Sequence, residues 1–203
     1  ETAPILTANP TFRETRKIGS IGFPMPGTDI KILNLDDPTQ EMPQGEEGEI
    51  AACGPQIMKG YWNRPDADEE VFVNLNGNRY FLTGDIGKID DDGYIFITDR
   101  KKDLILVGGF NVYPREVEDI LYTNPNVELT AVVGVPDKKS GEMVKAFIKL
   151  KEGSSATEDE IKAFCKENMA GYKRPRVIEF RDEIPVSNIG KVLRRVLRDE
   201  ARE

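Results

Sequence analysis

Histidine is absent from this chain of 203 residues, and cysteine occurs only twice. Without histidine, the chain contains no Ser-His-Asp triad, no Cys-His pair and no histidine metal ligand. Cys53 and Cys165 are far apart in sequence and match no metal-binding or redox spacing. We therefore expect two free thiols in a reducing, cytoplasmic environment.

Long hydrophobic runs are also missing. No stretch approaches the roughly 20 apolar residues that a membrane span requires. The opening residues, ETAPILTANP, have neither the basic nor the apolar part of a signal peptide. Because the chain opens on Glu and not on Met, we expect it to be a piece of a longer protein.

The net charge is −8, and it is unevenly distributed. Residues 1–100 carry 9 basic and 18 acidic side chains, whereas residues 101–203 carry 19 and 18. An acidic total argues against nucleic acid as a partner. The cations of the second half are available for small anions.

The first hundred residues consist of short extended pieces broken by Gly and Pro, such as GSIGFPMPGTDIKIL, GEIAACG and KGYWNRP. Alternation of polar and apolar residues predicts a strand at 28–33, and residues 81–100 read as two strands joined at DDDG. Residues 35–48 are polar and proline-rich, which is typical of a surface turn region. This pattern favours a small β-barrel or a bent sheet.

After residue 100 the period changes. Helices are predicted at 114–125, 154–169 and 191–202, and strands at 129–136, 143–150 and 176–185. Thr157 and Glu160 have the spacing of a capping box. The alternation predicts an α+β fold with two units, 1–100 and 101–203. The segment DRKKDLILVGGFNVYP, residues 99–114, crosses their boundary and sets a dense charged cluster directly against an apolar strand.

Three short motifs are candidates for chemistry. In TGD, the Asp85 carboxylate suits the two neighbouring hydroxyls of a sugar, although an Asp after Gly is more often a plain turn residue. Lys191 follows the loop SNIG and could carry a positive charge to a phosphate or carboxylate; the alternative is a solvated lysine at a helix start. Gly108 and Gly109 permit either close approach of a ligand or a tight turn.

The order and spacing of these motifs resemble the adenylate-forming superfamily, which contains acyl-CoA synthetases, luciferases and peptide-synthetase adenylation domains. The resemblance covers the whole chain and is carried by YFLTGD, DGYIFITDRKKDLILVGGFNVYPREVE and IPVSNIGKVLRRVLR. It is closest to long-chain fatty-acid–CoA ligases, through GPQIMKGYWNRPDA, GFNVYP, GYKRP and FRDEIPVSNIGKVLRR. Enzymes of this family use ATP to convert a carboxylate into an acyl-adenylate, release pyrophosphate, and then transfer the acyl group to the thiol of coenzyme A.

The resemblance implies roles for individual residues. Asp85 would bind the ribose hydroxyls of AMP, and Arg100 would contact the ribose or the phosphates. Lys191 would bridge the attacking carboxylate and the α-phosphate during adenylation. Residues 1–100 would form the C-terminal end of the large AMP-binding domain, and residues 101–203 its mobile C-terminal domain.

The remaining implied roles concern the hinge, coenzyme A and Mg²⁺. Lys102 falls at the family's hinge position, where the C-terminal domain would rotate between the two half-reactions. Gly108 and Gly109 would lie along the pantetheine channel. Glu1 and Thr2 resemble the end of the family's Tyr-Gly-x-Thr-Glu motif, whose glutamate helps to hold Mg²⁺.

Other parts of such an enzyme are not found in this sequence. It has no Gly/Ser/Thr-rich phosphate loop, adenine pocket or fatty-acid tunnel, which in the family lie upstream. We therefore expect the chain to be inactive alone. An aryl- or short-acyl-CoA ligase, a carrier-protein-loading enzyme and a non-catalytic binding module remain alternatives. Peripheral membrane association of the full-length enzyme also stays open.

Overall fold

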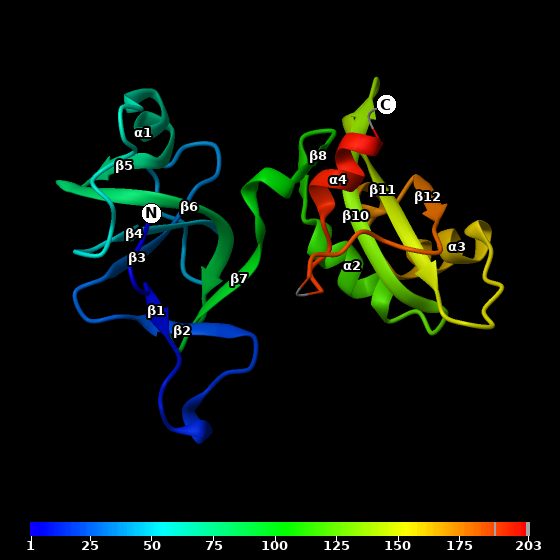
Figure 1. The fold of residues 1–203 in the computed structure, drawn as a ribbon, viewed down its shortest axis with the longest axis horizontal. Helices are drawn as coiled ribbons and strands as arrows, with labels where there is room; N and C mark the ends of the chain where they lie inside the picture. Colours follow the sequence, from blue (N-terminus) through cyan, green and yellow to red (C-terminus); the bar gives the residue numbers. More distant parts are fainter. Residues whose placement is uncertain (189, 202–203) are drawn as a thin grey trace. The chain divides into compact units, whose positions relative to one another are not determined.

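The computed structural model describes residues 1–188 and 190–201, which form two compact units, Glu1–Lys101 and Lys102–Glu203 (Figure 1). The division falls one residue beyond the boundary expected from the sequence. Both units combine helices with strands, which confirms the predicted α+β fold class. Among the described residues, no helix has the length and apolar character needed to cross a membrane.

The N-terminal unit is built on a seven-stranded sheet with the order β1-β2-β7-β6-β4-β3, in which β5 pairs with β6. The sequence left a small barrel and a bent sheet as alternatives. The structure has a curled sheet, in which β6 bends markedly (Figure 1). The elements are β1 (Thr7–Ala8), η1 (Arg13–Thr15), β2 (Ser20–Pro24), β3 (Asp29–Leu33), β4 (Gly48–Cys53), α1 (Pro65–Val71), β5 (Phe72–Leu75), β6 (Asn78–Ile89) and β7 (Ile95–Arg100).

The two strands expected at 81–100 are β6 and β7, and the DDDG turn joins them. The Asp90 carboxylate accepts hydrogen bonds from the backbone N–H groups of Asp92 and Tyr94, at 3.0 and 2.8 Å. Gly93 has a φ of +84°, which a glycine adopts without steric cost. The turn therefore results directly from its own residues.

Helix α1 was not predicted, because KGYWNRP reads as an extended piece ending at proline. The structure corrects this interpretation: Pro65 opens the helix, and Asp66 and Asp68 occupy its first turn. A proline at the first helical position and acidic residues beside the positive helix end are both favourable. Those signals were present in the sequence, but seven residues are too few to show a periodic pattern of apolar residues, which is the main sign of a helix.

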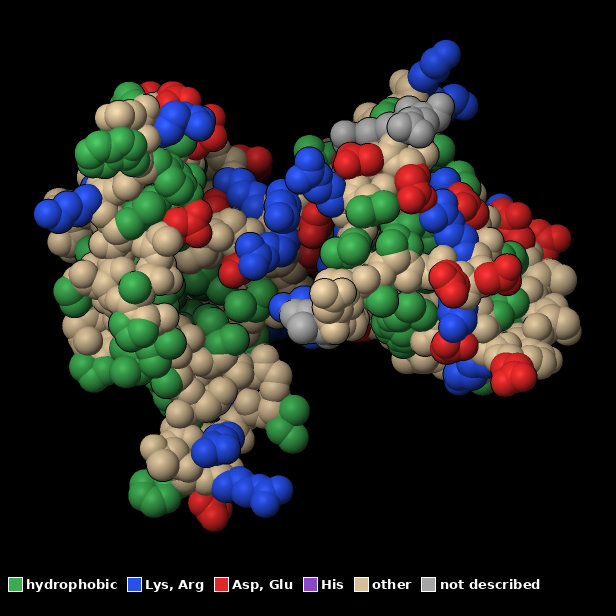
Figure 2. Space-filling view, in the orientation of Figure 1, with side chains coloured by type: hydrophobic (Ala, Val, Ile, Leu, Met, Phe, Trp, Pro, Cys, Tyr) green, Lys and Arg blue, Asp and Glu red, His purple; other side chains and the backbone are tan. Residues whose placement is uncertain are grey.

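Several large hydrophobic side chains of the N-terminal unit are exposed. Phe12, Ile18 and Trp62 have exposed fractions of 74%, 102% and 90%. Hydrophobic groups, green in Figure 2, form several separate patches on the visible face of this unit.

The C-terminal unit contains a five-stranded sheet with the order β10-β11-β8-β9, in which β12 pairs with β11 in parallel. Helix α3 connects β11 to β12, as a parallel pair requires. The elements are η2 (Lys101–Asp103), β8 (Ile105–Val107), β9 (Phe110–Val112), α2 (Pro114–Tyr122), β10 (Val127–Asp137), β11 (Gly141–Leu150), α3 (Glu158–Asn168), η3 (Gly171–Lys173), β12 (Val177–Phe180) and α4 (Arg194–Glu200).

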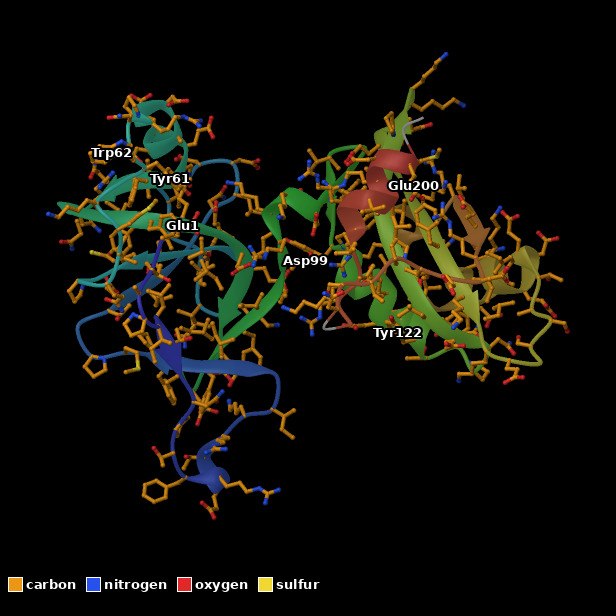
Figure 3. All side chains as sticks on the ribbon, viewed as in Figure 1. Glu1, Tyr61, Trp62, Asp99, Tyr122 and Glu200 are labelled. Carbon is orange, nitrogen blue, oxygen red and sulfur yellow. The ribbon has the colours of Figure 1, made fainter. Side chains whose placement is uncertain are left out.

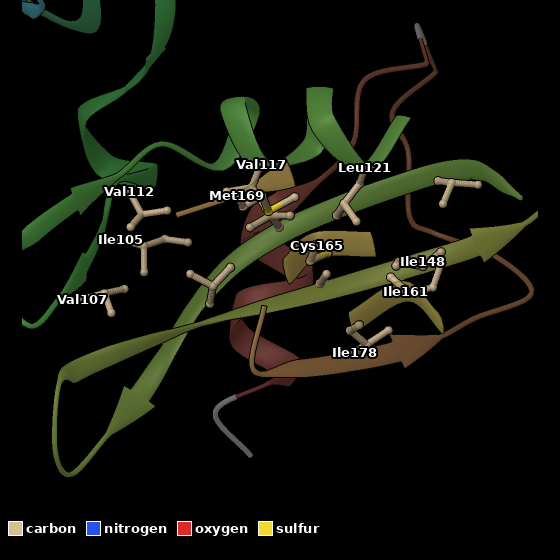
Figure 4. Close-up of a cluster of buried hydrophobic side chains, with 14 residues drawn as sticks. Ile105, Val107, Val112, Val117, Leu121, Ile148, Ile161, Cys165, Met169 and Ile178 are labelled. Atoms are coloured by element: carbon tan, nitrogen blue, oxygen red, sulfur yellow. The ribbon is translucent and has the colours of Figure 1, made fainter. Parts of the chain in front are cut away.

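Helices α2 and α3 pack on one hydrophobic cluster of this unit (Figure 4). Val117 and Leu121 of α2, the helix predicted at 114–125, are fully buried in this cluster. At the start of α3, Thr157 Oγ1 accepts from the Glu160 N–H at 3.3 Å, and the Glu160 carboxylate accepts from the Thr157 N–H at 2.8 Å. These reciprocal bonds confirm the predicted capping box.

The end of the chain differs from the prediction. Strand β12 stops at Phe180, and α4 begins at Arg194, not at residue 191. The intervening chain folds into a small hairpin, in which Val186 bridges Val192 and the Leu193 N–H donates to the Pro185 carbonyl at 2.9 Å. These local bonds satisfy backbone groups that a longer helix would otherwise have used.

Candidate functional site

Asp85 and Arg100 form a pair across two neighbouring strands. The ladder between β6 and β7 sets the two residues opposite each other, and Arg100 Nε lies 2.6 Å from Asp85 Oδ1. Asp85 therefore lies within strand β6 and is not the plain turn residue that an Asp after Gly more often is. Because cross-strand neighbours hold each other in place, the sheet itself orients both side chains.

An irregularity in β6 surrounds Asp85. The register between β4 and β6 shifts at this point, and Gly84 has a φ of +72°. Thr83 Oγ1 donates to the Ile50 carbonyl at 2.8 Å and accepts from the Asp85 N–H at 3.2 Å. Such an irregularity redirects a side chain out of the regular pleat, which explains why TGD occurs in the middle of a strand.

The buried carboxylate of Glu49 lies beneath this irregularity, and sequence reasoning missed it. Glu49 is 2% exposed, accepts from the Gly84 N–H at 3.1 Å and pairs with Lys101 Nζ at 2.6 Å. A glutamate inside the apolar strand GEIAACG was the available signal, because a buried charge requires a partner. Glu49 thus joins the TGD segment to the charged cluster at 99–103.

The chemistry of the Asp85–Arg100 pair fits a nucleotide. The Asp85 side chain is 21% exposed and the Arg100 side chain 54% exposed, so both are accessible from solvent. A carboxylate offers acceptor oxygens that suit hydroxyl groups, and a guanidinium offers several N–H donors that suit phosphate oxygens. Side by side, the two groups can receive a sugar and its phosphate.

Lys191 lies in the hairpin before α4. Its carbonyl accepts from the Ser187 N–H at 2.7 Å, and its own N–H donates to Ser187 Oγ at 3.1 Å. The residue is exposed and precedes the first helical residue, Arg194, by three positions. Lys191 is therefore a solvated lysine, as the alternative had it, but it lies in the loop before the helix and not at the helix start. Ile189, in the same loop, lies outside the described residues.

Gly108 and Gly109 form the two-residue turn between β8 and β9. Their φ values are +59° and +86°, the combination of a type I′ hairpin turn. A Cβ placed on either residue would meet no atom within 4 Å. The turn conformation alone accounts for the glycines, and the same open backbone leaves room for an extended ligand beside it.

Glu1 and Tyr61 meet in the N-terminal unit (Figure 3). The Tyr61 hydroxyl donates to Glu1 Oε1 at 2.5 Å, and this hydrogen bond raises the pKa of Tyr61. Within the part of the chain that the structure describes, no three or more His, Cys, Asp or Glu side chains are grouped to hold a metal ion. These residues therefore do not form a magnesium site by themselves.

The predicted site residues are divided between the two units. Asp85, Arg100 and Glu1 belong to the N-terminal unit, and in the part of the chain that the structure describes the contact among these three is the ion pair of Asp85 with Arg100. The hinge, glycine and lysine candidates belong to the C-terminal unit, on η2, on the β8–β9 turn and on the last hairpin.

Comparison with known proteins gives two family matches. Residues 1–62 match the AMP-binding enzyme family, and residues 116–191 match the AMP-binding enzyme C-terminal domain. A long-chain-fatty-acid–CoA ligase of Escherichia coli O6:H1 is 49% identical over 202 residues, which cover 100% of this chain and 35% of that enzyme. The chain thus spans about a third of the length of this relative.

Two further relatives broaden the comparison. A feruloyl-CoA synthase of an Amycolatopsis species is 42% identical over 96% of this chain and 38% of that enzyme. The crystal structure of ATP-bound MatB from Rhodopseudomonas palustris superposes with a TM-score of 0.87 at 34% identity, over 97% of this chain and 38% of that one.

Proposed function

The chain belongs to the AMP-binding enzymes of the adenylate-forming superfamily, and from that membership we propose that it is the C-terminal portion of an ATP-dependent fatty-acyl-CoA ligase. The observation that carries the proposal is the ion pair between Asp85 and Arg100, in a chain so similar to a long-chain ligase.

The Asp85–Arg100 pair would bind the nucleotide. Asp85 would accept hydrogen bonds from the two ribose hydroxyls, while the exposed guanidinium of Arg100 would donate to the ribose or the phosphates. Glu49 supports this arrangement, since it holds the neighbouring Gly84 backbone. The nucleotide would thus be held mainly by groups that the sheet fixes in advance.

Lys191 would act in the first half-reaction, in which the carboxylate of the substrate attacks the α-phosphorus of ATP and pyrophosphate leaves. Its ammonium would lie between the two reacting anions and offset their repulsion. An exposed lysine on a short hairpin suits this role, because it can reach a substrate without leaving a packed position.

The C-terminal unit would then rotate at Lys102 for the second half-reaction. The open turn at Gly108 and Gly109 would border the pantetheine arm of coenzyme A, whose thiol attacks the acyl carbon as AMP leaves. A hinge at a single exposed residue can take up a large torsional change. Glu1 would supply one carboxylate toward Mg²⁺.

The identity of the acid is the open part of the proposal. The long-chain ligases favour fatty acids, whereas the feruloyl-CoA synthase favours an aryl acid as second candidate. Turnover by the complete enzyme of palmitate and of ferulate, each with ATP and coenzyme A, distinguishes them. Residues 1–203 alone are expected to give no turnover of either acid.

The site is tested by Asp85→Ala in the complete enzyme. Loss of hydrogen bonds to a charged group should reduce transition-state stabilisation by about 3 kcal/mol, which lowers kcat/KM for ATP roughly 100-fold. Asp91→Ala, which removes an exposed carboxylate from the β6–β7 turn, is the matched control and should leave kcat/KM unchanged. Equal values of kcat/KM for ATP in the Asp85→Ala variant and the native enzyme would refute the nucleotide role.

A further inference from the structure

The charged cluster at 99–103 is held from both sides of Lys102. Lys102 itself is exposed, and no ion pair of its ammonium is recorded among the described residues. Its neighbours in the sequence, in contrast, are tied to buried or half-buried partners in their own units. The cluster is therefore not a uniformly solvated turn.

On the N-terminal side, Lys101 is the last residue that contacts its own unit through an ion pair. The β6–β7 ladder holds the backbone of Arg100, and Lys101 Nζ pairs with the buried Glu49 at 2.6 Å. Glu49 is 3% exposed in its side chain and also accepts from the Gly84 N–H. A buried carboxylate with one cationic partner strongly favours keeping that partner in place.

On the C-terminal side, a single side chain of α4 makes the tie. Arg198 Nη1 donates to the Lys102 carbonyl at 3.0 Å, and Arg198 Nη2 pairs with the Asp103 carboxylate. Arg198 and Asp103 are 22% and 11% exposed. The planar guanidinium holds both acceptors at once, and this fixes the peptide group between Lys102 and Asp103.

The same helix leads directly back to Lys191. Helix α4 is anchored by the buried Leu197, and two residues, Val192 and Leu193, separate Lys191 from its first helical residue, Arg194. Arg198 therefore connects the hinge residue, through one helix, to the hairpin that carries the proposed catalytic lysine. A helix is a rigid element over this short distance.

We infer that Arg198 is a positioning residue that makes the Lys102–Asp103 peptide part of the C-terminal unit, so that rotation is confined to the backbone torsions of Lys101 and Lys102. The inference rests on the proposed function, because the rotation serves the two half-reactions of a ligase. Glu49 serves the same end on the other side, because it holds the Lys101 side chain against the N-terminal unit. Confined to these torsions, the rotation delivers Lys191 and the β8–β9 turn to reproducible positions.

The test uses Arg198→Ala in the complete enzyme, with the two half-reactions measured separately. Imprecise docking should lower kcat for pyrophosphate exchange and for thioester formation from supplied acyl-adenylate, each by about 100-fold, with KM for ATP unchanged. Arg198→Lys keeps the charge beside Asp103 but lacks the second guanidinium nitrogen, which holds the Lys102 carbonyl. Its rates should fall between those of Arg198→Ala and the native enzyme.

Arg181→Ala is the matched control. Arg181 also ties α4, through Glu200 at 2.7 Å, but it has no recorded contact with η2 among the described residues. It should leave both half-reactions close to native rates. Equal losses in Arg181→Ala and Arg198→Ala would overturn the inference, because Arg198 would then only stabilise the helix.

A second measurement does not depend on activity. In the chain of residues 1–203, Arg198→Ala should make trypsin cleave after Lys101 and Lys102 on the order of tenfold faster, because the backbone there opens more often. Arg181→Ala should not. Unchanged cleavage in Arg198→Ala would overturn the inference even if the enzyme is a ligase. Faster cleavage of this chain, combined with a complete enzyme that shows no ligase activity, would support the clamp and refute only the proposed function.

Discussion

Glu118 of α2 and Arg194 of α4 form an ion pair in which the carboxylate is 8% and the guanidinium 23% exposed. Arg194 Nε donates to Glu118 Oε1 at 3.0 Å, and the same oxygen accepts from the Val132 N–H of β10 at 2.8 Å. One carboxylate therefore joins the first helix, the last helix and the longest strand of the C-terminal unit.

Glu118→Ala should destabilise the C-terminal unit by about 3 kcal/mol, because it leaves Arg194 and the Val132 N–H without this partner. The measurement is urea unfolding followed by far-ultraviolet circular dichroism. Glu128→Ala is the control: its carboxylate, 46% exposed, pairs with Lys149 at the surface and should cost less than about 1 kcal/mol. Similar costs for the two substitutions would contradict the structural role of Glu118.

Lys191→Ala in the complete enzyme should slow adenylation by about 3 kcal/mol, as expected when a preorganised positive charge is removed. Thioester formation from supplied acyl-adenylate should continue, because Lys191 would have no part in it. Pyrophosphate exchange and single-turnover transfer to coenzyme A measure the two steps. Lys138→Ala, at another exposed lysine of the same unit, should alter neither. If both steps fell equally with Lys191→Ala, the assigned role would be wrong.

Strong local patterns made much of the fold predictable. The strands at 81–100 and the helix at 114–125 correspond to β6, β7 and α2 because period and turn residues agree there. Helix α1 and the hairpin at 185–193 escaped prediction, since each depends on a few local hydrogen bonds and little apolar burial.

The site was predictable only in part. Asp85 and Arg100 could be named from motifs, but their contact depends on strand register, which no single motif reveals. Glu49 and Arg198 escaped prediction because their partners, Lys101, Lys102 and Asp103, are about 50 and 95 residues away along the chain. Long-range pairing of this kind is a property of the tertiary fold.

Thr157→Ala should destabilise α3 by about 1 kcal/mol, because the hydroxyl that accepts the Glu160 N–H is lost. Urea unfolding by circular dichroism measures the change. Thr157→Ser retains a hydroxyl in the capping position and should remain within a few tenths of a kcal/mol of the native chain. A cost for Thr157→Ser as large as that for Thr157→Ala would exclude the cap as the cause.

Cys53 should react with iodoacetamide well before Cys165. Cys165 is 1% exposed, and burial raises its pKa to about 11, so at pH 8 only about one molecule in a thousand carries its thiolate. Its alkylation should accelerate as the pH rises toward 11. Mass spectrometry of tryptic peptides measures both sites. In guanidinium chloride the two cysteines should react at similar rates, whereas similar rates in the folded chain would contradict the burial of Cys165.

The exposure of Trp62 has a practical consequence for all of these stability measurements. It is the one tryptophan of the sequence, and its indole is 90% accessible to water in the folded chain. An indole already surrounded by solvent changes its emission little when the chain unfolds. Intrinsic tryptophan fluorescence will therefore change little during denaturation. It will report least on the C-terminal unit, which has no tryptophan of its own.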